Sequence, residues 1–597
     1  MWGAEPQQRL ARVTTLFALV LFAVGVPLLP TPGLKSTATL LADLVLVLGF
    51  YAALRSGGRI NQTRLDAPAL ALLLIASLAT LLAINPLVSY IPSTSRGDGL
   101  LVYLAYLGAA VMTARLSRTD ISILLTALLA GGALIGSVAI LQYYGLDATH
   151  LFRNRALVFG RSWGTLDNPI FLGGYLCLVF PLSLALTSSP TEKHWQWYAI
   201  VSVLLYATLM ASGTRSAWFA CGVAIVLLAV LLRTSSAFAM RWALLALAFT
   251  TVTAIMILTR PQVSFGQRAL SALDPSDPSL QGRLFIWMHA IPLLFQRPIL
   301  GWGFSSLLSQ HLGMGSQDYF KTFGHQPLAI DTMHNEMLHI IFSIGLLGLG
   351  AYLWVWGTVF RSLRDAFRAG GPQAGVAAGL IGCMAAYAAW LQLGWTEVGP
   401  ANVFWTLAGA AVALGRIASN ALCASEARKQ AIPPLSPFVE PVRSTSSKSR
   451  LGFGLMEFLV VSVMLAGLVV LVSPSYHAAR ERVSDAQRIE EAEGWHILQH
   501  AAYEEAREIG RRWRTLAQAC FARTRRTASC AGNRAIGFLA SAINWRFDDS
   551  VEYITAPASI MMKARAAIDD PFVIGETYTI ILNTITGKAS EKFGPQP

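Results

Sequence analysis

The sequence predicts an all-α polytopic membrane protein of about twelve transmembrane helices, followed by a small α+β domain on one further membrane helix. Of the 597 residues, 54% are hydrophobic and only 13% are charged, and the mean hydropathy is +0.51. Apolar runs of nearly twenty residues, long enough to cross a bilayer, recur over residues 1–420. Beyond these runs the chain turns polar, and a single further apolar run begins near residue 451.

Each apolar run before residue 420 is a candidate span with uncertain ends. The runs lie at residues 11–30, 37–55, 67–85, 99–114, 120–142, 169–188, 196–212, 216–232, 240–258, 333–356, 375–394 and 401–418. The longest connection, residues 259–332, separates the ninth run from the tenth. We therefore expect one multi-span membrane domain over residues 1–420 that carries a single large loop.

Basic residues mark one set of alternating loops. Because positive clusters stay in the cytoplasm, we expect these loops and the N-terminus there, in a bacterial inner membrane. Loop 259–332 then lies in the periplasm, since long loops cross largely regardless of charge. The clusters are Arg55, Arg59 and Arg64; Arg115 and Arg118; Lys193; Arg233 and Arg241; and Arg361, Arg364 and Arg368.

The net charge of +13 belongs mostly to these short loops. No nucleic-acid motif or basic surface interleaved with aromatic residues accompanies it. The composition therefore indicates membrane lipids as partners and argues against nucleic acid.

A polar segment, Asp331-Thr-Met-His-Asn-Glu336, joins the long loop to an apolar helix. Imidazole is the side chain best suited to take a proton from a hydroxyl near neutral pH, so His334 is a candidate general base. Taken alone, a histidine in this position is more often a satisfied interfacial residue than a catalyst. Asn335 and Glu336 are supporting candidates that orient the imidazole or cap the helix.

Four arginines, Arg96, Arg161, Arg215 and Arg283, fall on the same outward side as His334. Guanidinium forks bind phosphate oxygens bidentately. Arg215 lies in a tight turn between two apolar runs, where a cation needs an anionic partner or reaches lipid phosphates. Arginines for a diphosphate together with a histidine base suit glycosyl transfer from a lipid-linked diphosphate sugar.

The long loop also predicts an amphipathic helix that carries Arg283. Leu280, Leu284, Trp287 and neighbouring apolar residues recur at spacings of three and four, which would place Arg283 simply on the polar face. We expect the apolar face, completed by Ile291 and Leu294, to rest on the membrane surface or on the bundle.

These residues resemble the O-antigen ligase superfamily, which includes Wzy-type polymerases and bacterial protein O-oligosaccharyltransferases. The resemblance covers roughly residues 10–420. It rests on the multi-span architecture and on Arg161-x-x-Gly-Thr-Leu-x-Asn168, Gly213-Thr-Arg-Ser216, Arg283 with Trp287, Pro298-x-x-Gly-x-Gly303 and His334-Asn335.

The resemblance implies transfer of a glycan from undecaprenyl diphosphate to an acceptor hydroxyl on the periplasmic face, by a metal-independent inverting reaction without a cofactor. It implies that His334 is the base, that Arg215 and Arg283 hold the diphosphate, and that Arg161 and Asn168 belong to the same pocket. An outward Asp-x-Asp motif, which would suit a divalent metal, is absent from the bundle loops.

Residues 421–450 are polar and proline-bearing, which predicts a cytoplasmic linker to a second module over residues 451–597. The start of this module resembles a type IV prepilin: Gly452 and Phe453 follow basic residues, and Glu457 stands five positions along an apolar run. The resemblance implies cleavage after Gly452 by a prepilin peptidase and assembly with pilins. The alternative is an ordinary membrane anchor with one tolerated glutamate.

The second module is expected to form a helix over residues 453–512 and a small periplasmic domain over residues 513–597. Candidate strands lie at residues 551–555 and 577–584. Cys520 and Cys530 are either a disulfide pair, as an extracytoplasmic domain permits, or two free thiols.

The leading hypothesis is a glycosyltransferase whose acceptor is lipid A–core, a growing polysaccharide or a protein hydroxyl, and the pilin-like module favours protein. A transporter is less favoured, because the spans show no clear repeat with paired broken helices. A pilus or secretion assembly component, or a joined reading frame, would also account for the second module.

Overall fold

The computed structural model describes most of the first 430 residues and short parts of the remainder. The described residues are 4–29, 32–55, 62–91, 98–146, 161–234, 237–260, 265–275, 277–307, 332–430, 507, 511, 513–520, 522, 545–547, 559–566, 576–583 and 589–595. The chain divides into two compact units, one made of residues 1–314 and 330–481 and the other of residues 315–329 and 482–597.

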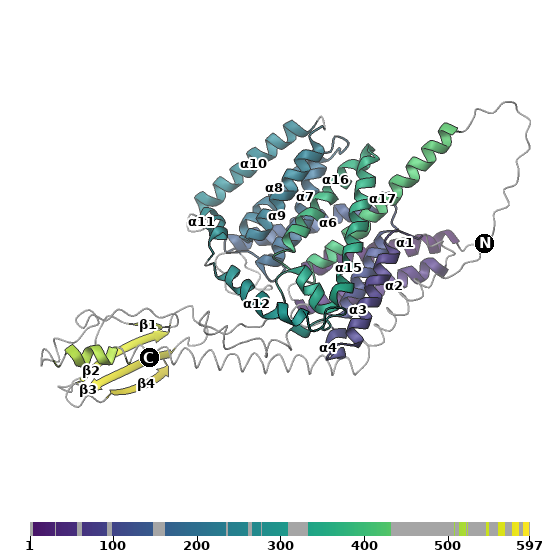
Figure 1. Cartoon of the computed structure of the whole chain (residues 1–597). Coiled ribbons are helices and arrows are strands. Elements are labelled where there is room, and N and C mark those ends of the chain that lie inside the picture. Colours follow the sequence, from purple (N-terminus) through teal and green to yellow (C-terminus); the bar gives the residue numbers. More distant parts are fainter. Residues whose placement is uncertain are drawn as a thin grey trace, which may run out of the picture. The chain divides into compact units, whose positions relative to one another are not determined.

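The described part of the first unit is a bundle of helices (Figure 1). α1 continues into a π-helical turn (Leu21–Gly25) and a 3-10 turn (Val26–Leu28). The helices are α1 (Ala4–Val20), α2 (Pro32–Arg55), α3 (Asp66–Leu81), α4 (Pro86–Tyr90), α5 (Leu100–Thr113), α6 (Arg118–Tyr143), α7 (Pro169–Ser188), α8 (Trp195–Ser212), α9 (Arg215–Leu232), α10 (Phe238–Thr259), α11 (Phe265–Leu270), α12 (Pro278–Leu294), α15 (Glu336–Arg368), α16 (Ala374–Trp390) and α17 (Pro400–Gln430).

Every one of the twelve expected apolar runs falls on a helix. Within the described residues, seven helical segments are long and apolar enough to cross a membrane, so the protein is a multi-pass membrane protein. Three further apolar helices, α3, α5 and α16, are shorter. The full number of twelve spans therefore stays a prediction. The seven segments are Ala11–Leu28, α6, α7, α9, α10, α15 and Pro400–Cys423.

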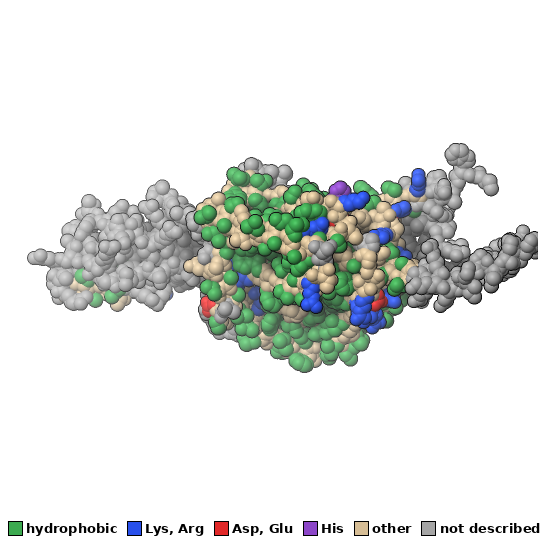
Figure 2. All heavy atoms as spheres, turned by 90° about the horizontal axis from the view of Figure 1, so that it is seen from above, with side chains coloured by type: hydrophobic (Ala, Val, Ile, Leu, Met, Phe, Trp, Pro, Cys, Tyr) green, Lys and Arg blue, Asp and Glu red, His purple; other side chains and the backbone are tan. Residues whose placement is uncertain are grey.

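The helix ends that carry the basic clusters lie at one end of the bundle and are joined there by ion pairs. We call this end the basic end of the bundle. Arg115 at the end of α5 pairs with Asp66 at the start of α3 at 2.9 Å. Arg64 pairs with Asp365 near the end of α15 at 2.7 Å, and Arg12 of α1 pairs with Asp120 at the start of α6 at 2.7 Å. Figure 2 looks onto this end of the bundle and shows blue Lys and Arg side chains among hydrophobic ones.

The opposite helix ends are joined by the segments that the sequence analysis placed outward. Lys35 at the start of α2 donates to Thr165 O at 2.9 Å, and Thr165 Oγ1 donates to Pro27 O at 2.7 Å. Gln142 near the end of α6 donates to Gly164 O at 2.8 Å. The helices thus alternate in direction between this end and the basic end, as the loop charges predicted.

α15 is broken near its start by the segment that follows α12. Gly345 has φ +70 and ψ −174, which interrupts the helix. Trp302 N and Gly303 N donate to Phe342 O and Ser343 O at 2.8 and 2.9 Å, and Leu346 N donates to Pro298 O at 2.8 Å. The Pro298–Gly303 motif therefore satisfies the backbone groups that the break exposes.

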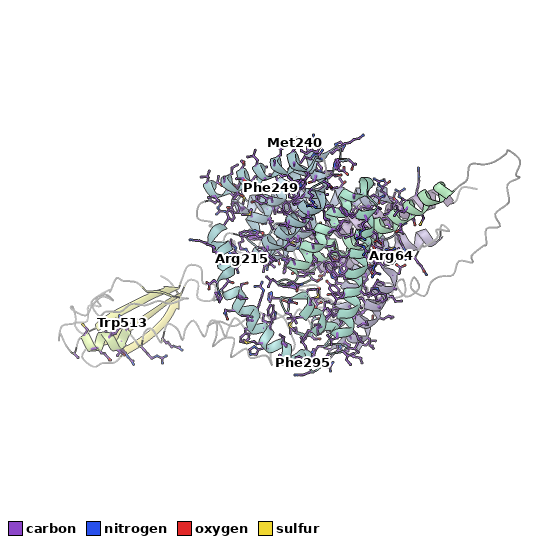
Figure 3. The ribbon with its side chains drawn as sticks, turned by 45° about the horizontal axis from the view of Figure 1, so that its top comes forward. Arg64, Arg215, Met240, Phe249, Phe295 and Trp513 are labelled. Carbon is purple, nitrogen blue, oxygen red and sulfur yellow. The ribbon has the colours of Figure 1, made fainter. Side chains whose placement is uncertain are left out.

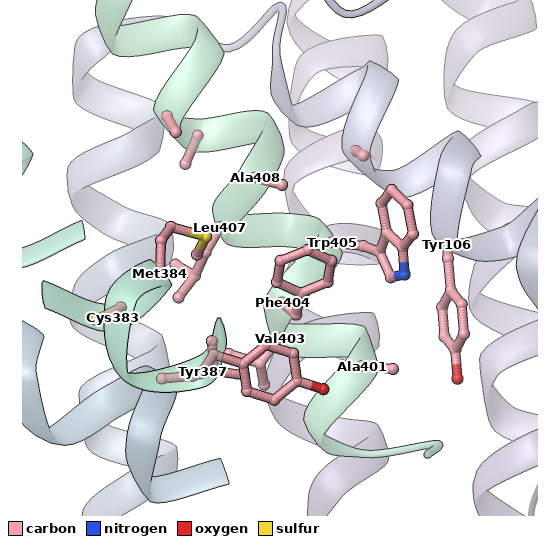
Figure 4. Packing of buried hydrophobic residues seen from close by; sticks show 14 of the residues in the cluster. Tyr106, Cys383, Met384, Tyr387, Ala401, Val403, Phe404, Trp405, Leu407 and Ala408 are labelled. Atoms are coloured by element: carbon pink, nitrogen blue, oxygen red, sulfur yellow. The ribbon is translucent and has the colours of Figure 1, made fainter. Parts of the chain in front are cut away.

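Aromatic side chains fill the centre of the bundle, where α5, α16 and α17 meet (Figure 4). Tyr387 stacks on Phe404 with ring centroids 5.1 Å apart, and Trp405 stacks on Tyr106 at 6.4 Å. The outer helices instead expose large apolar side chains, among them Phe219 of α9. Met240 of α10, labelled in Figure 3, is another. Lipid contact explains such a surface in a multi-pass protein.

α12 packs through a face that overlaps the predicted one only in part: Trp287 and Leu294 of the expected apolar face pack against the buried cluster that contains Ile286 and Ala290. Ile286 and Ala290 are buried, whereas Leu284 and Ile291 of the expected apolar face are exposed. The helix is apolar on both sides, so spacing alone did not identify the side that packs. Phe295, just past its end, is exposed and labelled in Figure 3.

The described part of the second unit holds a four-stranded antiparallel sheet of order β1-β2-β3-β4. Met561 of β2 lies opposite Ile581 of β3, and Tyr578 of β3 lies opposite Phe593 of β4. The strand expected at residues 577–584 is β3, while the one at residues 551–555 lies outside the described residues. The strands are β1 (Trp545–Phe547), β2 (Ser559–Ala566), β3 (Glu576–Asn583) and β4 (Ala589–Pro595).

Residues 513–520 of the same unit are helical and bury Trp513, Ala517 and Cys520 along one side. Cys520 is disulfide-bonded, and its partner lies outside the described residues. Gly452, Phe453, Glu457, Cys530 and nearly all of the expected helix 453–512 also lie outside them. The resemblance to pilins therefore stays a prediction.

Candidate active site

A cavity of about 290 Å³ lies at the end of the bundle opposite the basic end, between α9, α11 and α12. Four arginines line it, and Asp277 is the acidic residue among the described lining. Ile170, Phe219, Leu280 and Leu393 add apolar walls. The four arginines are Arg161, Arg215, Arg268 and Arg283.

The turn between α8 and α9 positions two of these arginines. Arg161 donates through Nε to Ser212 O at 2.8 Å and through Nη2 to Thr214 Oγ1 at 2.9 Å. Arg268 donates through Nε to Gly213 O at 2.6 Å. Backbone carbonyl groups of this turn thus accept hydrogen bonds from one arginine of segment 161–168 and from another on α11.

Gly213 is required where the two guanidinium groups cross this turn. Its φ of +56 lies in the left-handed region, and an added Cβ would lie 3.0 Å from Arg268 Nε and 3.3 Å from Arg161 Cγ. The Gly-Thr-Arg-Ser motif therefore has a local physical role: it ends α8, starts α9 and seats the neighbouring arginines.

Arg215 forms a bidentate ion pair with Asp277. Nη1 and Nη2 each lie 2.8 Å from a carboxylate oxygen, and Nη1 also donates to Ser271 Oγ at 2.8 Å. Asp277 caps α12 as well, because Oδ1 accepts from Ser279 N at 3.1 Å and from Leu280 N at 3.3 Å. Figure 3 labels Arg215 at the start of α9.

Arg283 enters the cavity from α12, two turns from its start. It donates to Ser279 O at 2.9 Å and to Leu393 O at 3.2 Å. Its buried Nε has no hydrogen-bond partner among the described residues. Arg283 is therefore more than the polar face of a surface helix: it crosses from α12 to the segment after α16.

The arginines repel one another in a partly desolvated space. Burial, with the charges of Arg268 and Arg215, lowers the pKa of Arg161 to about 9, at which it is still a cation at neutral pH. Burial and Arg215 also lower the pKa of Arg268 and of Arg283. The hydrogen bonds from Arg215 hold the pKa of the Asp277 carboxyl below its usual value. A site with this excess of positive charge favours an anion.

His334 lies next to this cavity but outside its lining. Its backbone is left-handed, with φ +48, which is uncommon for a residue with a side chain. Its ring meets Trp395 edge-on at 4.5 Å between centroids. Trp287 of α12 donates from Nε1 to Met333 O at 2.8 Å, so the helix that carries Arg283 also fixes the peptide before His334.

Residues 391–396, which follow α16, join His334 to the arginine cavity. Leu393 lines the cavity and accepts from Arg283, while Gln392 O accepts from Asn335 Nδ2 at 3.0 Å. Trp395 contacts His334, and Thr396 binds Glu336. This connecting segment carries no basic or histidine residue, and the sequence analysis missed it.

The supporting residues take structural positions. Asn335 caps α15 by accepting from Leu338 N at 3.0 Å, and Asn168 caps α7 by accepting from Ile170 N at 2.8 Å. Glu336 is buried and accepts from Thr396 N at 2.7 Å and from Thr396 Oγ1 at 2.5 Å. Arg96 lies outside the described residues.

Two cavity residues, Arg268 and Asp277, were not predicted as site residues. Both lie in the long loop between α10 and α15, before the part of it in which apolar residues recur at helical spacing. Among the described residues, no group of three or more His, Cys, Asp or Glu side chains could hold a metal ion.

In comparison with known proteins, the family model described as "O-Antigen ligase" matches residues 200–353. This range contains Arg215, Arg268, Asp277, Arg283 and His334, whereas Arg161 and residues 391–396 lie outside it.

Ninety-two residues of the chain are similar to segments of curated relatives. They are 34% identical to the "Putative polysaccharide ligase" of Rickettsia prowazekii (strain Madrid E) and 32% identical to the protein of that name in Rickettsia typhi (strain ATCC VR-144 / Wilmington). The alignments cover 15% of this chain and 21% of each relative. The chain thus spans about a fifth of the length of the curated relatives it matches.

Proposed function

We propose that this protein is a membrane glycan transferase of the O-antigen ligase type. It moves a glycan from undecaprenyl diphosphate to an acceptor hydroxyl on the periplasmic face of the inner membrane, without a metal or another cofactor. The arginine cavity beside His334 carries the proposal, because a diphosphate needs concentrated positive charge and the transfer needs a base nearby.

In this proposal, His334 and the arginine cavity have different roles in the reaction. His334 takes the proton of the acceptor hydroxyl, and the oxygen forms a bond to the anomeric carbon of the glycan. The bond from that carbon to the phosphate oxygen breaks, and the diphosphate leaves with the electron pair. The four arginines stabilise its developing negative charge, which is the role a divalent metal takes in other sites.

The apolar walls suit the lipid part of the donor. Phe219 lines the cavity and is exposed on α9, and Leu280 and Leu393 also line the cavity. A ligand with an anionic head and an isoprenyl chain matches such a lining better than a soluble sugar nucleotide does.

The acceptor follows from different observations and is a separate proposal. The pilin-like sequence after Gly452 favours a protein hydroxyl as the acceptor, with pilins and a prepilin peptidase as partners. The relatives carry the name "Putative polysaccharide ligase". A polysaccharide or lipid A–core is the alternative acceptor.

The proposal is tested with purified protein and undecaprenyl diphosphate carrying a radiolabelled glycan, in the presence of lipid A–core, polysaccharide and pilin acceptors. We expect label in one acceptor fraction, at the same rate with and without EDTA. Label that stays on the donor lipid with all three acceptors contradicts transfer, and loss of transfer on chelation contradicts the metal-independent mechanism.

A further inference from the structure

We propose that Asp277 is an internal anion that occupies the guanidinium fork of Arg215 in the free protein and is displaced from it when a diphosphate enters. This inference rests on the proposed function, because it concerns the same cavity. It assigns Asp277 as a residue that sets the affinity and selectivity of the site.

The geometry of the ion pair is that of an anion site already filled. Both oxygens of Asp277 meet Arg215 at 2.8 Å, which is the parallel arrangement that guanidinium also makes with phosphate oxygens. Arg161, Arg268 and Arg283 line the same cavity. An entering diphosphate would therefore meet three arginines directly and find the fork of the fourth occupied.

Displacement would leave Asp277 with other partners. Oδ1 already accepts from Ser279 N at 3.1 Å and from Leu280 N at 3.3 Å, at the positive end of the α12 dipole. A carboxylate that caps a helix stays hydrogen-bonded when its arginine turns to another anion. The exchange thus leaves the half-buried carboxylate with hydrogen-bond donors, whereas loss of all partners is the usual obstacle to breaking an ion pair.

The exchange would also keep the catalytic side of the site in place. Asp277 caps α12, and Trp287 on the same helix donates to Met333 O at 2.8 Å, beside His334. Because the cap does not depend on Arg215, α12 and the peptide before His334 keep their positions while Arg215 changes partner.

Competition of this kind predicts selectivity for highly charged ligands. An anion must outcompete a bidentate carboxylate to use Arg215, so a monophosphate gains less than a diphosphate from the same cavity. Removal of the carboxylate should raise the affinity for the diphosphate at least as much as the affinity for the monophosphate, because the diphosphate is the ligand that displaces the carboxylate from Arg215.

The test measures binding of farnesyl diphosphate and farnesyl monophosphate to the full chain in detergent, by titration calorimetry. Asp277→Asn and Asp277→Ser each remove the charge and keep a side chain able to cap α12. We expect each variant to bind the diphosphate roughly ten-fold more tightly than the unaltered protein does, within the usual range for coupled binding events. Asp365→Asn, which removes an ion-paired carboxylate at the basic end, should change nothing.

A double-variant cycle separates competition for Arg215 from a general change of charge. In the Arg215→Gln background, Asp277→Asn should improve affinity for the diphosphate by less than about three-fold. This smaller gain is what remains when the lost negative charge acts only through screened long-range electrostatics. Unchanged or weaker binding by both Asp277 variants would overturn the inference and leave the diphosphate site intact. An equal gain in the Arg215→Gln background would also overturn it. Failure of the unaltered protein to bind farnesyl diphosphate would instead remove the proposed function itself.

Discussion

At the scale of single residues, uncommon backbone geometry collects around the candidate site. Asp167, Ser305 and His334 are the non-glycine residues with positive φ in the described chain, and each lies at the end of the bundle that holds the cavity. Such conformations cost about 1–3 kcal/mol each and persist where the surrounding structure imposes them. Trp395 and the Trp287 bond to Met333 O supply that support at His334.

The sequence allowed some of these residues to be predicted, for a physical reason. A guanidinium between two apolar runs needs an anionic partner, so Arg215 could be predicted as a site residue from the sequence. Arg268 lies on a six-residue helix within a long polar loop, where an arginine is unremarkable. Asp277 gained its role only because folding places α12 beside α9, which local sequence does not encode.

Substitution of Arg268 tests at the residue scale whether the arginine cavity takes part in transfer. Arg268 lines the cavity while its Nε donates to Gly213 O at 2.6 Å, so its guanidinium contributes one of the four positive charges at the site. We expect Arg268→Ala to lower glycan transfer by about 10²–10³-fold, the usual effect of removing one charge-stabilising donor.

The matched control for that variant is Arg233→Ala. Arg233 follows the other end of α9 at the basic end and is exposed. Both variants should insert into the membrane at the level of the unaltered protein. Transfer rates measured on equal amounts of purified protein decide between them, and an Arg268→Ala protein as active as Arg233→Ala would remove Arg268 from the site.

At the scale of elements, the break in α15 ties the long loop to the helix that follows His334. An alanine Cβ at Gly345 would lie 2.1 Å from Ile299 O and 2.4 Å from Leu300 N. Glycines at the Pro298-x-x-Gly-x-Gly303 motif meet the same break from the other side. The sequence predicted the motif and the helix separately, but not that one interrupts the other.

Gly345→Ala should therefore destabilise the bundle by at least about 2 kcal/mol, from the positive φ and the overlap with backbone atoms. It should also reduce transfer, because the segment from Glu336 to the break would shift. Thermal unfolding in detergent and the transfer rate measure the two effects.

Gly350→Ala is the matched control within the same helix. An added Cβ there meets nothing within 4 Å, and Gly350 has ordinary helical geometry. We expect stability to change by no more than about 1 kcal/mol, in the stabilising direction. Similar melting temperatures for the two variants would contradict the role assigned to Gly345.

At the scale of the whole molecule, the basic end and the arginine cavity lie at opposite ends of the same helices. Loop charge alone predicted this alternation, because each cluster of cations flanks a helix end. The number of spans was harder to predict: α3, α5 and α16 have 16, 14 and 17 residues, near the lower limit for crossing a bilayer.

Orientation in the membrane is a prediction that reporter fusions can check. Alkaline phosphatase, which is active only outside the cytoplasm, should be inactive when fused after Lys193 at the α7–α8 turn of the basic end. It should be active when fused after Leu393, which lines the cavity. The reverse pattern would place the site on the cytoplasmic face and would exclude a periplasmic transfer.

The central claim is that His334 acts as the base in transfer from a lipid-linked diphosphate. The most direct measurement is the single-turnover rate of glycan transfer from undecaprenyl diphosphate by the purified His334→Ala protein. His194→Ala, which alters an exposed histidine just before α8, is the control. We predict a loss of about 10²–10⁴-fold for His334→Ala, with farnesyl diphosphate affinity unchanged, and full activity for His194→Ala. A His334→Ala protein that transfers glycan at the unaltered rate would contradict the account.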